Sequence, residues 1–150
     1  MKKIVLFMLV FLMLVPVNVN ALNSENNTNR EYYDDGSYFE IVIEEKMMNS
    51  RSSTKTGSKT AKYIDSNGNA CWYVKVTGIF SYDGSSAKCT SSSVNAGVYN
   101  NLWEIISKSS SKSGATATAT ALAALYYNGN VVDRKTKSIS LKCSSNGTLS

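Results

Sequence analysis

The sequence contains no histidine, and its 150 residues include three cysteines and one proline. Without histidine, a Ser-His-Asp site, a Cys-His site and a His-containing zinc site cannot form. Three cysteines far apart in the sequence also fall short of the four thiolates of an all-cysteine zinc site. We therefore expect a protein without enzyme activity, and we assign no catalytic residue, no metal ligand and no cofactor.

Long hydrophobic runs are also missing. The single apolar stretch of note is Ile4–Val15, whose twelve residues suit the core of a signal peptide and are too few to span a bilayer. Two lysines precede it, Pro16 follows it, and Val19-Asn20-Ala21 supplies the small residues of a cleavage site. We predict that residues 1–21 are a signal peptide, that the mature protein is extracellular, and that it keeps no membrane span.

The charges are divided between two regions. Residues 22–50 carry seven acidic and two basic side chains, whereas residues 51–150 carry twelve basic and four acidic ones. The polar, Asn-rich start of the acidic region predicts flexible chain. Apolar alternation then favours a strand at 38–48, and a Ser/Thr/Lys/Gly stretch ends this region as a linker. The predicted organisation is an acidic segment and linker at 22–58 and a folded domain at 59–150.

Period-two alternation of apolar and polar residues dominates the remainder of the chain. It predicts strands at 60–65, 70–82, 102–112, 115–127 and 131–143, with a less clear pattern over 86–100. Asn67-Gly68 and Asn128-Gly129 are typical of type I′ hairpin turns. Short strands separated by turn signals predict an all-β fold, an antiparallel immunoglobulin-like sandwich with a flexible acidic N-terminal segment.

One of these strands has a helical alternative. The segment 117–125 is rich in alanine and leucine, which favour helix, but threonine alternates with alanine over 115–120, which includes its first residues. The repeated threonines and the neighbouring strand patterns favour a strand over the whole of 115–127.

The three cysteines are expected to form one disulfide and leave one free thiol. Cys143 shares a face with Ile139 and Leu141, while Cys71 falls on the polar face of its strand. Because residues that face inward from two sheets can approach to bonding distance, we favour Cys89–Cys143 with Cys71 free. A hairpin bridge between Cys71 and Cys89 remains the alternative.

Several segments resemble a family of small secreted β-rich proteins of Gram-positive bacteria without an assigned activity. The most specific of them is W-x-V-x-V-T-G-x-F, which starts at Trp72. The similarity covers residues 35–38, 71–82, 84–90, 109–120, 141–144 and 146–150. The resemblance implies export, a β fold and a usual cysteine pair at Cys89 and Cys143, with Cys71 as an extra cysteine. It implies no catalytic residue.

Basic side chains are the candidate binding residues. They are Lys75, Lys88, Lys108, Lys112, Arg134, Lys135, Lys137 and Lys142. A basic face attracts anionic polymers, although the same charges also serve solubility. Export makes nucleic acid an unsuitable partner, which leaves an anionic cell-envelope polymer or a protein. We also expect the acidic segment, especially 39–45, to dock on the basic domain as an edge strand or shield.

Two functions follow from these features. The first is a secreted, non-enzymatic β-sandwich protein that binds a cell-wall polymer, a surface or a protein at the cell exterior. The second is a secreted antimicrobial or toxin-like effector that acts on membranes or competing cells. The apolar run at 119–127, together with size and positive charge, is the support for the second.

Overall fold

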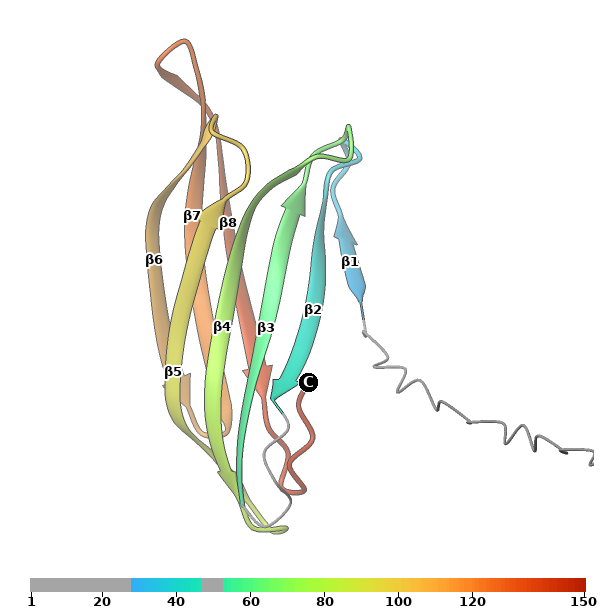
Figure 1. Ribbon diagram of the computed structural model, residues 1–150, viewed down its shortest axis with the longest axis vertical. Coiled ribbons are helices and arrows are strands. Elements are labelled where there is room, and N and C mark those ends of the chain that lie inside the picture. The colour runs from blue at the N-terminus through green and yellow to red at the C-terminus, as the bar shows by residue number, and fades with distance from the viewer. Residues whose placement is uncertain (1–27, 47–52) are drawn as a thin grey trace, which may run out of the picture.

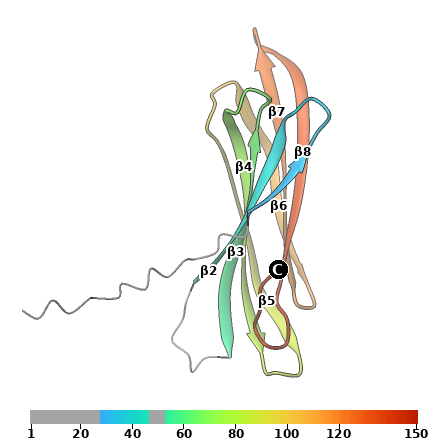
Figure 2. The same cartoon turned by 90° about the vertical axis from the view of Figure 1, so that its right-hand side faces the viewer.

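The computed structural model describes residues 28–46 and 53–150, so the predicted signal peptide and its cleavage site lie outside the described residues. Two antiparallel sheets pack as two layers (Figures 1 and 2). The five-stranded sheet contains, in order, β1 (Asn29–Tyr32), β2 (Tyr38–Lys46), β3 (Thr54–Ile64), β4 (Ala70–Tyr82) and β5 (Ala87–Val98). The three-stranded sheet contains β6 (Trp103–Ser113), β7 (Thr116–Tyr127) and β8 (Asn130–Lys142).

The predicted antiparallel β-sandwich is confirmed, while its immunoglobulin-like type is not. Each strand pairs with its neighbour in sequence, and the chain passes from one sheet to the other once, between β5 and β6. An immunoglobulin domain instead distributes its strands so that the chain crosses between the sheets several times. Within the described residues no helix forms that is long and apolar enough to cross a membrane.

The core lies between the two sheets and follows the alternation of β4. Trp72, Val74, Val76 and Phe80 are fully buried, whereas Tyr73 between them faces outward. Opposite them, the alternate alanines of β7 are buried as well: Ala117, Ala119, Ala121 and Ala123. Small side chains on β7 leave room for the large rings of β4. The alanine and threonine segment forms this strand, so the helical alternative is wrong.

Of the two predicted type I′ hairpin turns, one forms and the other is of a different type. Asn128 and Gly129 both have positive φ, 49° and 78°, which confirms a type I′ turn there. At 65–69 only Gly68 has positive φ, and its N–H donates to the carbonyl of Asp65. This is a type I turn followed by a residue in the left-handed region, so the predicted I′ turn is wrong. The Asp65 carboxylate, which accepts from the N–H of Asn67 and Asn69, stabilises it.

The acidic segment is part of the sheet. Asn29–Tyr32 forms β1 where flexible chain was expected, and β3 begins at Thr54, inside the predicted linker. The predicted strand at 38–48 corresponds to β2, which pairs with β3 along its whole length. Phe39 is fully buried and Ile41 is 6% exposed. The segment does dock on the domain, but β2 is an inner strand between β1 and β3, and a domain boundary at residue 59 would cut through β3.

Candidate binding face on the five-stranded sheet

The eight basic residues chosen from the sequence are not brought together on one face. Lys75 points outward from the five-stranded sheet and Arg134 from the three-stranded one, while Lys108 and Lys112 lie on the edge strand β6. Lys88 and Lys142 lie at the end of the sandwich where β5 begins and β8 ends. Lys135 and Lys137 share the inward face of β8 with Ile139 and Leu141.

The two inward lysines hold the N-terminal strand. Lys137 forms an ion pair with Glu31 of β1, and its ammonium lies 4.8 Å from the ring centroid of Phe39. The ammonium of Lys135 lies 5.0 Å from the ring centroid of Tyr33. The side chain of Lys135 is only 19% exposed and that of Lys137 only 11%. These two residues therefore stabilise the fold and are not available to a polymer.

The predicted disulfide is not formed. Cys71, Cys89 and Cys143 are all free and all buried. Cys71 is buried because β4 has a bulge there: Ala70 pairs with Ile64 and Trp72 with Tyr63, so Cys71 has no partner residue in β3. Its thiol therefore does not lie on the polar face that simple alternation predicted. Its carbonyl accepts hydrogen bonds from the backbone N–H groups of Tyr99 and Asn100.

We expect all three thiols to be protected in the native protein. Burial raises the pKa of Cys71, Cys89 and Cys143, which lowers the thiolate fraction available for reaction at pH 8. Without reductant, a thiol-specific chromogenic reagent should react slowly with the native protein and should titrate three thiols per chain after denaturation. A single thiol after denaturation would contradict the free Cys89 and Cys143 of the structure.

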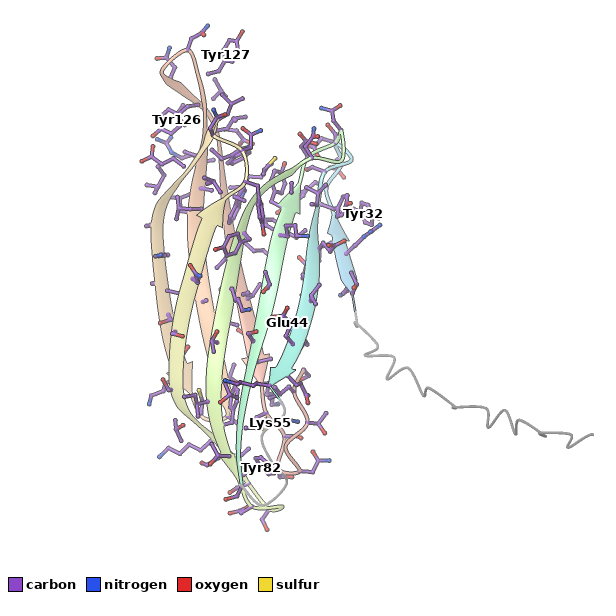
Figure 3. The ribbon with its side chains drawn as sticks, in the orientation of Figure 1. Tyr32, Glu44, Lys55, Tyr82, Tyr126 and Tyr127 are labelled. Atoms are coloured by element: carbon purple, nitrogen blue, oxygen red, sulfur yellow. The ribbon has the colours of Figure 1, made fainter. Side chains whose placement is uncertain are left out.

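A hollow of about 420 Å³ lies on the outward face of the five-stranded sheet. Its lining comes from β2, β3, β4, β5 and the residue after β5: Glu40, Val42, Glu44, Thr60, Lys62, Tyr73, Lys75, Asn95 and Tyr99. Strand register places Arg30, Glu40, Lys62, Tyr73 and Gly97 in one row across the sheet. Figure 3 shows Glu44 on β2 in the middle of this face.

The carboxylates of the hollow alternate with cationic groups. Glu40 lies between Arg30 and Lys62, with N–O distances of 3.3 Å to each. Glu44 accepts from the Lys75 ammonium at 2.8 Å and from the Ser58 hydroxyl at 3.2 Å. The hydrogen bond from Lys75 and its charge hold the pKa of Glu44 below its usual value. Glu44 is therefore ionised at neutral pH, and the hollow offers donors and acceptors side by side.

Two aromatic rings form one wall of the hollow. The centroids of Tyr73 and Tyr99 are 5.5 Å apart, with planes inclined by 42°. A Cβ on Gly97 would lie 3.0 Å from Cε1 of Tyr73, so glycine lets this ring lie close to the backbone of β5. The two backbone N–H bonds to the Cys71 carbonyl fix the chain at Tyr99 and Asn100. The bulge at Cys71 thus places the Tyr99 ring, whose residue is 57% exposed.

A second tyrosine pair lies on the same face at the β1–β2 edge. The ring centroids of Tyr32 and Tyr38 are 5.1 Å apart, and the Arg30 guanidinium lies 5.0 Å from the Tyr38 centroid. Tyr32 is 65% exposed and extends outward beside β1 (Figure 3). One tyrosine pair therefore lies beside the Arg30–Glu40 end of the charged row, and the other lies at its Tyr73 end.

Of this face, the sequence prediction contained only Lys75. Glu40, Tyr73 and Tyr99 were missed because the predicted binding residues were all basic, and Lys62 was not among them. The alternation of apolar and polar residues over 38–46 and 70–82 was sufficient to predict which positions face outward. Their proximity to each other depends on the pairing of β2 with β3.

No family model, curated protein or solved structure matches the chain. The described residues also contain no group of three or more His, Cys, Asp or Glu side chains placed to hold a metal ion.

Proposed function

We propose that this protein is exported and acts as a non-enzymatic binding protein at the cell exterior. Its ligand, an extended polymer of the cell envelope, lies on the outward face of the five-stranded sheet. The signal-like residues 1–21 support export, and the hollow with its aromatic wall supports binding. Convergent polar groups beside aromatic side chains are the usual make-up of a ligand site.

This face, rather than a basic patch, is the site in our proposal. Lys62 and Lys75 on it are paired with carboxylates, and Lys135 and Lys137 lie inside the sandwich. The paired charges lower the net positive potential that an anionic polymer would need. Binding through shape and paired polar groups fits the observed arrangement better than binding through net charge.

We expect Asn95→Arg to weaken binding to purified cell walls about tenfold or more, which corresponds to about 1.4 kcal/mol. Asn95 is an exposed β5 residue that pairs with Lys75, so a long side chain there enters the hollow without disturbing the core. Co-sedimentation of the purified protein with cell walls, over a range of wall concentrations, measures the change.

Ser109→Arg is the matched control for this variant. Ser109 is also an exposed strand residue, and it pairs with Thr120 in the other sheet, so the substitution adds the same charge on a different face. Its binding should equal that of the parent protein. Parent-like binding of Asn95→Arg, or equal loss in both variants, would contradict a site on the five-stranded sheet.

A membrane-acting effector is the second candidate, and one observation favours it. Leu102, Ile106, Tyr127 and Val132 are 45–64% exposed in the β6 and β7–β8 regions. Tyr127 lies at the protruding end of the β7–β8 hairpin (Figure 3). Exposed apolar groups gathered at one end are suited to contact with another surface. Release of dye from anionic phospholipid vesicles by the parent protein, lost in Tyr127→Ser, would favour this function.

A further inference from the structure

We infer that the polymer on this face is an uncharged or weakly charged glycan that runs across the strands and stacks on the two tyrosine pairs. The inference rests on the proposed function, because it uses the same outward face. It adds the chemical class of the ligand, its direction relative to the sheet and the residues that hold it.

The tyrosine pairs supply the apolar contact. A pyranose ring has an apolar C–H face and a polar hydroxyl edge, so an amphipathic aromatic ring can pack against that face and leave the hydroxyls free. Tyr99 offers such a ring, fixed through its backbone and by contact with Tyr73. Because the Tyr73 ring lies close to Gly97, the wall stays low against the sheet and leaves the hollow open for a sugar.

The charged row supplies the polar contacts. A sugar hydroxyl donates one hydrogen bond and accepts others, and Glu40 and Lys62 present an acceptor and a donor in adjacent strands. Glu44 on β2 and Lys75 on β4 present a second acceptor and donor, which meet across β3. Since opposite charges alternate, a neutral ligand with both donors and acceptors matches this row better than a polyanion does.

The spacing of the aromatic pairs gives the direction of the chain. Tyr38 on β2 and Tyr73 on β4 are two strands apart, which is roughly 10–12 Å between Cα atoms. Tyr38 pairs with Ile64 of β3 and Tyr73 pairs with Lys62, so a ligand that contacts both pairs must cross β3 beside Lys62, which lines the hollow. A polymer with repeated apolar faces meets this requirement, whereas a peptide in the same position would be perpendicular to the strands and could not pair with their backbone.

Competition and substitution test the inference with the purified protein. Oligomers of N-acetylglucosamine and of β-1,4-linked glucose are the neutral glycan probes, polyphosphate is the anionic probe, and wall peptides released by an amidase are the peptide probe. We expect at least one glycan to displace the protein from cell walls, with less than about a twofold change in its affinity between low and high salt. Tyr99→Leu should weaken glycan binding about tenfold, while Tyr99→Phe stays near the parent.

Tyr127→Leu is the matched control, since it removes an exposed tyrosine from β7 of the other sheet, and it should bind like the parent. If Asn95→Arg abolishes wall binding, but only polyphosphate or peptide displaces the parent protein from cell walls, the ligand is not a glycan. The proposed binding function then still holds. If glycans compete and Tyr99→Leu binds as well as Tyr99→Phe, the stacking arrangement is wrong. If Asn95→Arg binds walls and glycans like the parent, both the proposed site and the ligand assignment fail.

Discussion

A chain that begins at Arg51 is expected to lose its cooperative fold. The deletion removes β1 and β2, and with them Phe39, which is fully buried against Tyr63 and Trp72 at ring-centroid distances of 5.3 and 5.4 Å. Truncating one buried Phe costs about 3–5 kcal/mol, and loss of Ile41 adds a comparable amount. The total stability of a domain is about 5–15 kcal/mol, so most of it would be lost. Circular dichroism during heating should show no sharp transition.

The full-length Phe39→Ala variant serves as the graded control for this deletion. It should remain folded with a lower midpoint of unfolding, because β2 keeps its pairing with β3. If the shortened chain instead melts with the sharp transition of the parent, then β1 and β2 are an appendage, as the sequence suggested. The shortened chain is basic and is expected to be unfolded, so it could bind anionic polymers for that reason alone. Increased binding to such polymers would therefore not show that the acidic segment acts as a shield.

Strands β4, β6, β7 and β8 were predictable because their alternation is local, whereas the pattern over β5 was less clear. In β4 every second residue from Trp72 to Val76 is fully buried, and the predicted limits of 70–82 are those observed. The acidic segment was misjudged because its composition resembles disordered chain while its stability comes from distant partners. Glu31, for example, pairs with Lys137 on the far sheet. Pairing between strands this far apart in sequence cannot be read from local pattern.

The candidate face was less predictable than the fold, for two physical reasons. A bulge inverts the expected direction of Cys71, and it also fixes the backbone that carries Tyr99. Outward residues become a site only when strand register places them in one row, as it does for Glu40, Lys62 and Tyr73. Net charge was therefore a poor guide, since carboxylates of the same sheet neutralise Lys62 and Lys75.

Gly78→Val is expected to lower the free energy of unfolding by about 3 kcal/mol, at the upper end of the usual cost of overpacking. Gly78 pairs with Gly57 on the inward face. A Cβ there would lie 2.5 Å from Cε2 and Cζ of Phe80, and 3.0 Å from Cβ of Ala117 on the opposite sheet. Both neighbours are fully buried, so neither ring nor backbone can move away freely. Urea unfolding at 25 °C measures the loss.

Thr77→Val, the adjacent and outward residue, should change stability by no more than about 0.5 kcal/mol, because it adds no atom to the core. A double-mutant cycle then assigns the cost to Phe80. In Gly78→Ala, the added Phe80→Leu should destabilise less than it does in the parent, by about 1 kcal/mol or more, because the contacting ring is gone. Strict additivity would show that the strain lies elsewhere. A positive coupling would show that the absent side chain at residue 78 is what allows Phe80 to fill the space between the two sheets.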